Sequence, residues 1–391
     1  MGSSLKILIL IGSALFSAGA TFITNRLALR PWRRSRGQHW SEKARLSFPV
    51  RQAATSNLLI VPGNVMLAVS LLWPGTSPLW VFAGMVSVVG TGAGTLALDH
   101  EIFPRISGQD LLRQSAIGAL QRFLLLFVLL GGAASMPDEF GWATWMIAGA
   151  VIGIGFLWSG GGWIWTGRKL GLFRPAPERL RRIATETSAR MSIPFRDVLL
   201  MRVSFAQGIA IVETRTLLFT ERLLEVCPDN EVAAICAHEL AHLTESRVAR
   251  YTRSVQLLTF LPWLFFNPLI HLWGMIGLFA LCGVSLSAPR IYRMISRKLE
   301  SRADEMAKGS EVDAGTYASA LTRLYADNLV PAVITRTTHP DLYDRILAAG
   351  VTPDFARPVA AKAMAWNGTM FAMVFGGLIA ALALRMILAA K

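Results

Sequence analysis

The residues with the clearest chemical potential lie at positions 237–242, where the chain reads Ala-His-Glu-Leu-Ala-His. Residues 230–250 are good helix formers, and side chains four residues apart on a helix lie on one face. His238 and His242 could therefore bind one metal ion. Glu239 would lie beside its open coordination position and take a proton from water, an arrangement that hydrolyses peptide bonds. The alternative is two surface histidines on an ordinary helix, although the chain has only six histidines in 391 residues.

A catalytic zinc ion needs a third protein ligand, and a second charged helix offers one. The sequence predicts this helix over residues 290–308, ended by Gly309. Glu300 and Asp304 lie four residues apart on it and so face the same way. Glu300 is the candidate third ligand, and Asp304 can accept a hydrogen bond from the far nitrogen of a zinc-bound histidine. Alternatively, both acids pair on a solvated face with the neighbouring basic residues Arg297, Lys298 and Arg302.

The elements that must position these residues are predicted to be a helix and a small sheet. Residues 177–191 have the spacing of an amphipathic helix. Three short β-rich runs follow and predict a small antiparallel sheet just before the histidine-bearing helix. These runs cover residues 197–203, 208–213 and 215–220. Asp229 or Asn230 is the expected N-cap of the histidine-bearing helix.

The rest of the chain has the composition of a membrane protein. It is 53% hydrophobic and 16% charged, with a mean hydropathy of +0.45, whereas soluble domains are about one quarter charged. Residues 1–166 are predicted to form a membrane region with about five transmembrane helices. These cover residues 5–22, 57–73, 79–98, 115–136 and 142–165. The fourth is the weakest, because Arg122 interrupts it.

The net charge of +14 is concentrated in short segments next to apolar spans, after the first span and again after the fifth. Cytoplasmic loops carry such an excess, so the domain after residue 166 is predicted to face the cytoplasm. The first span is then an uncleaved helix and not a signal peptide. No basic and aromatic motif accompanies the charge, so nucleic acid is not an expected partner. Three cysteines without a C-x-x-C pair favour a reducing compartment.

An apolar insertion divides the polar part of the chain in two. Residues 167–253 and 290–364 read as two parts of one soluble domain. Residues 254–289 between them are predicted to form an apolar membrane hairpin, because their length suffices for two spans of about 27 Å. The alternatives are one buried core helix with a loop, or a re-entrant hairpin. Residues 365–391 are predicted to form a last transmembrane helix.

The chain resembles the integral-membrane gluzincin metallopeptidases, the group that contains the HtpX heat-shock protease and the CAAX prenyl endopeptidase. The resemblance covers roughly residues 178–350. It includes residues 231–242, residues 296–304 (Ser-Arg-Lys-Leu-Glu-Ser-Arg-Ala-Asp), and His339-Pro340 followed by Arg345. It implies a mainly α, multi-pass membrane protein with an α+β zincin-like catalytic domain.

The family pattern also implies a site. One zinc ion per chain would be held by His238, His242 and Glu300, with Glu239 as the general base. Asp304 would accept a hydrogen bond from the far nitrogen of a zinc-bound histidine, as its spacing already suggested.

Two further positions matter in the family pattern. His339 and Arg345 are expected near the active site, where they would help to stabilise the oxyanion. The alternative is that Pro340 opens a helix and Arg345 makes a structural ion pair. The family usually has Asn-Ala-Phe-Ala-x-Gly before the catalytic helix, whereas this chain has Val203 in place of the asparagine. This departure concerns fine specificity and not the zinc site.

These observations predict a membrane-embedded zinc-dependent endopeptidase that hydrolyses peptide bonds of membrane or membrane-associated proteins at the cytoplasmic face. The expected partners are protein or peptide substrates and the lipid bilayer, and the N-terminal spans could bind a further membrane partner. The expected location is the cell inner membrane, as a multi-pass protein. A sensor-transducer with a regulated protease site and a catalytically silent scaffold are the alternatives. The intact ligands and base argue against the scaffold.

Overall fold

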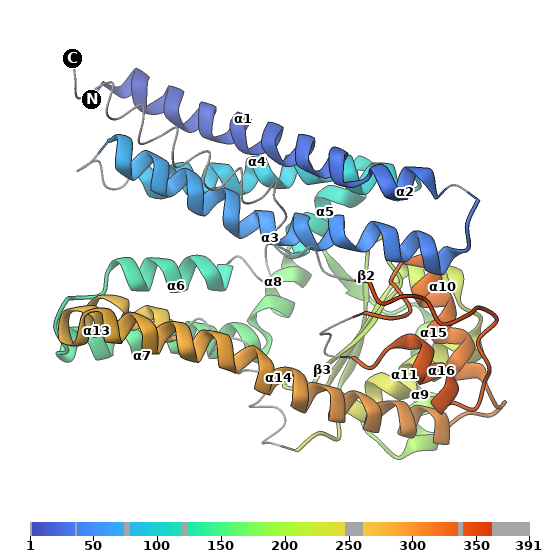
Figure 1. Cartoon of the computed structure of the whole chain (residues 1–391). Coiled ribbons are helices and arrows are strands. Elements are labelled where there is room, and N and C mark those ends of the chain that lie inside the picture. The colour runs from blue at the N-terminus through green and yellow to red at the C-terminus, as the bar shows by residue number, and fades with distance from the viewer. Residues whose placement is uncertain are drawn as a thin grey trace. The chain divides into compact units, whose positions relative to one another are not determined.

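The protein was analysed as a computed structural model, which describes residues 2–35, 37–73, 79–118, 124–246, 261–334 and 339–361. The chain divides into two compact units (Figure 1). The first comprises Met1–Leu111, Leu329–Thr335 and Arg357–Lys391, and the second comprises Leu112–Asn328 and Arg336–Ala356.

The first unit is built from long helices that pack through small residues. Its elements are α1 (Ser3–Ala28), α2 (Arg30–Arg34), α3 (Trp40–Leu72) and α4 (Leu79–Ile102). Helix α1 lies along α4, and Gly90 makes their close approach feasible, because a Cβ at this position would lie 2.2 Å from the carbonyl oxygen of Ala14. Leu29, Ala54 and Leu98 join α1–α2, α3 and α4 in one apolar cluster.

Four helices among the described residues are long and apolar enough to cross a membrane, which indicates a multi-pass membrane protein. They are Ser3–Arg34, Leu79–Ile102, Trp142–Lys169 and Met275–Gly309. The first three contain the predicted spans 5–22, 79–98 and 142–165.

The remaining predicted spans of the membrane region and the predicted C-terminal span are not among these four helices. Residues 57–73 lie mostly in α3, where the described apolar stretch is Ile60–Leu72, so this span remains a prediction. Residues 115–136 contain the end of α5 (Gly108–Gly118) and all of α6 (Leu124–Ala134), and residues 119–123 between them lie outside the described part. Most of the predicted C-terminal span also lies outside the described residues.

The second unit contains a four-stranded sheet that the sequence predicted in place but not in topology. Its strands are β1 (Phe173–Pro175), β2 (Asp197–Met201), β3 (Gly208–Ile211) and β4 (Thr216–Thr220), in the order β1-β2-β4-β3. The sheet is mixed and not antiparallel, because β2 pairs with β4 in parallel. After β2 the chain skips one position in the sheet and forms β3. It then turns back and forms β4 between β2 and β3, antiparallel to β3. Among the described strands, β3 pairs with β4 alone and is an edge of the sheet.

Helices surround this sheet and carry the candidate site. In chain order, the second unit contains α7 (Trp142–Leu157), a π-helical turn (Trp158–Gly162), α8 (Trp163–Lys169), α9 (Glu178–Met191), α10 (Glu221–Val226), α11 (Asp229–His242), α13 (Phe266–Trp273), α14 (Met275–Gly309), α15 (Thr316–Asp327) and α16 (Leu342–Ala348). Helix α11 packs against α9, α14 and α15, and α15 packs against α16. Figure 1 shows the C-terminal part of α14 beside α11 and α16.

Several predicted helix boundaries were wrong. Helix α11 ends at His242 and does not continue to residue 246, and its N-cap is Pro228 instead of Asp229 or Asn230. The predicted helix 290–308 is only the second half of α14, which starts at Met275 and runs unbroken to Gly309. One arm of the predicted hairpin is thus the start of α14. The other is described only from residue 261, as a short 3₁₀ turn and α13, so the hairpin remains a prediction.

Candidate metal centre

Helix α11 is held at its N-terminal end by ion pairs with two other helices. Asp229 receives hydrogen bonds from Arg179 and Arg182 of α9. Glu231 is buried, and the Arg323 guanidinium of α15 binds both of its carboxylate oxygens, at 2.6 and 3.0 Å. Acidic side chains in a first helical turn also complement the positive end of the helix dipole. These contacts fix where the later turns of α11 place the two histidines.

Three buried ligand atoms meet between α11 and α14. The Nε2 atoms of His238 and His242 are 3.2 Å apart. The Oε2 atom of Glu300 lies 3.4 Å from the first nitrogen and 3.7 Å from the second. All three side chains are buried. The structure therefore brings together the three ligands that the sequence predicted.

This arrangement fits a zinc ion. Bonds of about 2.0–2.1 Å in tetrahedral geometry place neighbouring ligand atoms about 3.3–3.4 Å apart, close to the observed separations. Two imidazoles and one carboxylate are also the ligand set of catalytic zinc sites, which leave the fourth position for water or substrate.

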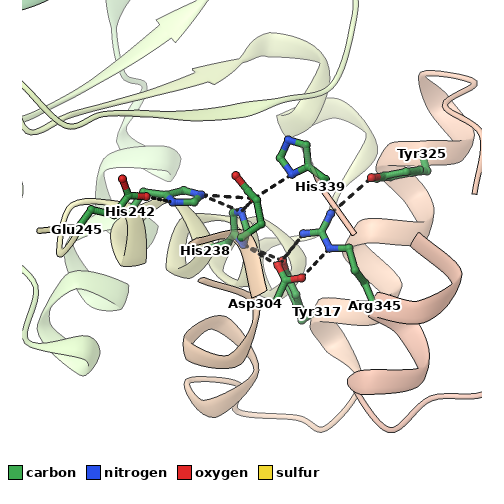
Figure 2. A network of polar contacts seen from close by, with 9 residues as sticks. His238, His242, Glu245, Asp304, Tyr317, Tyr325, His339 and Arg345 are labelled. Atoms are coloured by element: carbon green, nitrogen blue, oxygen red, sulfur yellow. Dashed lines mark hydrogen bonds and ion pairs between the residues drawn. The ribbon is translucent and has the colours of Figure 1, made fainter. Parts of the chain in front are cut away.

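The far side of His238 is held by a network from three other helices (Figure 2). Its Nδ1 atom lies 2.8 Å from the Tyr317 hydroxyl and 3.1 Å from Oδ1 of Asp304. The Tyr317 hydroxyl donates to Asp304 at 2.6 Å. Because burial raises the pKa of Tyr317 well above its usual value, this hydroxyl stays protonated. Its oxygen then accepts the Nδ1 proton, which leaves Nε2 of His238 free to bind a metal.

The same network affects the charge of His238. Burial opposes protonation of the imidazole, but hydrogen bonds to Asp304 and Glu300 outweigh it and raise the pKa of His238 to about 9. A cation that binds Nε2 must therefore displace a proton, so metal binding and proton release are coupled.

His242 is supported in a simpler way. Its Nδ1 atom lies 2.7 Å from Oε1 of Glu245, three residues along the chain and buried. This contact again directs Nε2 towards the other ligands. Glu245 was not predicted as a site residue, although an acid three residues after His242 was a usable signal.

Glu239 lies on α11 next to the sheet edge. Its side chain is buried, and a Cβ on Gly208 of β3 would lie 3.0 Å from the Cγ of Glu239. The absence of a side chain at Gly208 thus lets the edge strand lie directly against the predicted general base. This places a strand edge and a carboxylate within reach of one bound peptide, although the proton-transfer role itself remains a prediction.

The structure places His339 and Arg345 on two different acids. The Nδ1 atom of His339 lies 2.9 Å from Oε2 of Glu300, and its side chain is half exposed. Arg345 is buried and binds Asp304 through two nitrogens, each at 2.7 Å, and it also donates to Tyr317 at 2.8 Å. His339 thus lies at the ligands, whereas Arg345 lies behind them. Their part in oxyanion stabilisation remains a prediction.

Val203, the position that departs from the family pattern, is buried in an apolar cluster with Ile211 and Leu218. The hydrogen bonds that hold this segment come from another residue, Asn328. The side chain of Asn328, at the end of α15, donates to the carbonyl of Ala206 at 2.7 Å and accepts from its amide at 2.9 Å. Asn328 therefore holds the backbone that leads into β3. Neither this role nor that of Tyr317 carried a sequence signal, because each is a single residue on an amphipathic helix.

The site combines two buried histidines one helical turn apart with a glutamate from a second helix. A further glutamate and the edge of the sheet lie beside them. This combination defines a zinc metallopeptidase of the gluzincin class. Residues 176–350 match the sequence model of peptidase family M48, and this part of the chain is therefore an M48 zinc metallopeptidase domain. A comparison with curated proteins finds no match.

Proposed function

We propose that this protein is an endopeptidase that cleaves membrane or membrane-associated proteins at the cytoplasmic face of the membrane. The observation that carries this proposal is the convergence of His238, His242 and Glu300 in the same unit as a helix, Met275–Gly309, that is apolar enough to cross a bilayer. A site built on such a helix lies close to the membrane surface. Substrates with segments near that surface reach it most readily.

Each side chain of the site has a defined task in this reaction. When bound, zinc supplies a Lewis acid for the peptide carbonyl and lowers the pKa of a coordinated water. The carboxylate of Glu239 accepts the proton that the attacking water loses and passes it to the amine of the departing product. Asp304 and Glu245 keep the histidine Nε2 atoms directed at the metal through contacts with the opposite ring nitrogens.

The edge strand β3 is the proposed binding site for the substrate backbone. Within the described part of the chain it pairs with β4 on one side, and its other side can accept an extended peptide. Gly208 brings this strand into contact with Glu239. A peptide added to β3 would therefore pass the base and the three ligands in an extended conformation, which exposes a single carbonyl to attack.

The distribution of charge supports the cytoplasmic orientation. The candidate span Trp142–Lys169 ends in Arg168 and Lys169, and further basic residues follow in the first part of the peptidase domain. An excess of Lys and Arg next to a span marks its cytoplasmic end.

The test compares Glu239→Gln with the wild-type enzyme in the membrane proteome of an otherwise identical host. The variant should keep one zinc per chain by mass spectrometry and lose the fragments that the wild type generates. Glu300→Ala serves as the matched control, because it should lose both zinc and cleavage. Persistent cleavage by Glu239→Gln would sink the proposal. Fragments confined to soluble proteins would contradict the membrane-linked substrate class.

A further inference from the structure

Helix α1 is polar on its buried face and apolar on its exposed face. The small polar side chains of Ser13, Ser17, Thr21 and Asn25 are buried. In contrast, Phe16 and Ile23 are 59% and 58% exposed. Soluble helices show the opposite pattern, because water favours polar side chains outside. The exposed face of α1 is therefore a lipid-facing surface.

The apolar part of this surface has the length of a bilayer core. It runs from Leu5, 44% exposed, to Leu27, 41% exposed, and its exposed charged side chains, Lys6 and Arg26, each lie next to one end. Over the 22 residue steps from Leu5 to Leu27, a helix rises about 33 Å, close to the ~30 Å of the hydrocarbon layer. Leu27 thus lies near the boundary between acyl chains and headgroups.

Two arginines continue the same surface beyond that boundary. Arg30 and Arg34 follow Ile23 and Leu27 at steps of three and four residues, so all four lie on one face of the helical segment Ser3–Arg34. Both arginines are exposed. They lie about 5 and 10 Å past Leu27 along the helix, at the depth of lipid phosphates.

The neighbouring Arg33, in contrast, is neutralised by an acidic side chain. It is half-buried and binds both carboxylate oxygens of Glu101 on α4, at 2.5 and 2.7 Å. Across the part of the chain that the structure describes, no acidic side chain pairs with Arg30 or Arg34. These two guanidinium groups thus face the headgroup layer with their charges uncompensated by the protein.

We propose that Arg30 and Arg34 form a binding site for the phosphate groups of anionic phospholipids. The planar guanidinium donates two parallel hydrogen bonds to phosphate oxygens, and its charge favours lipids with net negative charge over zwitterionic ones. The site lies on the first unit and involves none of the residues of the metal centre. It would fix the depth of α1 in the bilayer through lipid contacts and not through protein contacts.

The test measures lipid binding to the full-length protein by native mass spectrometry, with phosphatidylglycerol and phosphatidylcholine of identical acyl chains. The double variant Arg30→Gln/Arg34→Gln should bind phosphatidylglycerol about 25-fold more weakly, since each basic residue near a membrane surface contributes about fivefold. Phosphatidylcholine binding should not change. Arg30→Lys/Arg34→Lys should retain most of the binding, because it keeps the charge.

The matched control removes the same charge elsewhere. Arg174→Gln/Arg196→Gln replaces two exposed arginines of the peptidase domain, and it should leave phosphatidylglycerol binding unchanged. An equal loss in this control, or an unchanged affinity in the Arg30/Arg34 variant, would overturn the proposal. Wild-type protein that binds both lipids equally would also overturn it. Displacement of phosphatidylglycerol by millimolar inorganic phosphate would reassign the site to free phosphate. Thermal unfolding confirms that each variant is folded.

Discussion

The two zinc-binding histidines lie one helical turn apart, but they are supported from different parts of the molecule. His238 depends on Asp304 of α14, Tyr317 of α15 and Arg345 of α16. His242 depends on Glu245, three residues along the same segment. One ligand is therefore oriented by tertiary packing and the other by local structure. The geometry of His238 reports whether three helices have docked, whereas the contact of His242 with Glu245 needs only α11 and the turn that follows it.

The largest effect is expected from Asp304→Ala. This change removes a partner of His238 and leaves the buried Arg345 charge without its main counterion. The free energy of unfolding should fall by about 3–5 kcal/mol, and the zinc affinity by up to about 100-fold. Denaturant unfolding in detergent and competition with a zinc chelator measure the two quantities. Asp304→Asn keeps the side-chain shape and should have a smaller effect. An unchanged stability would refute the dependence of His238 on tertiary packing.

The next effect is that of Arg345→Met. Asp304 then keeps its contacts with Tyr317 and His238 but loses two charged hydrogen bonds. We expect a loss of about 3 kcal/mol in stability and of about 30-fold in zinc affinity. This variant separates the two roles considered for Arg345. If kcat falls while zinc affinity and stability stay at wild-type values, Arg345 acts on the oxyanion and does not position Asp304.

A smaller effect is expected at the locally supported histidine. Glu245→Ala should lower zinc affinity about tenfold, because Nδ1 of His242 loses its carboxylate partner. The stability should change by only about 1 kcal/mol, because this hydrogen bond joins two residues only three apart in the chain. The same unfolding and chelator assays apply. A destabilisation as large as that of Asp304→Ala would erase the contrast between the two histidines.

The smallest effect is expected from Tyr317→Phe. The ring remains stacked near His238, and Asp304 still lies 3.1 Å from Nδ1. The loss of the hydroxyl should cost about 1 kcal/mol and about threefold in zinc affinity. A double-mutant cycle of Tyr317→Phe with Asp304→Asn should show coupling, because both groups share one network. Strict additivity would show that the network acts as separate contacts.

The difference between these two supports also explains what the sequence could predict. His238 and His242 were identified because helical spacing places their side chains on one face. Glu300 was identified as the third ligand that zinc needs, on a second helix that matches the family pattern, and the three converge as expected. Asp304 followed from the same spacing. Tyr317 could not be identified, because only the docking of α15 brings it to His238. The parallel pairing of β2 with β4 was missed for a related reason, since it depends on β4 lying between two strands that precede it.

The membrane part shows the same limit. Composition and run length predicted three of the four helices that are long and apolar enough to cross a membrane, because these properties depend on local sequence. The end of α11 at His242 depends instead on the turn that brings Glu245 back to the imidazole. A run of good helix formers does not reveal that turn.

Helix α14 connects the bilayer mechanically to the active site. Its 35 residues form one continuous helix, about 52 Å long. The apolar half can cross a membrane, and the other half carries Glu300 and Asp304. Transmembrane helices tilt to match the local hydrocarbon thickness. Any such tilt moves the zinc ligand at the far end of the same rod, so the thickness of the surrounding lipid becomes a variable of the active-site geometry.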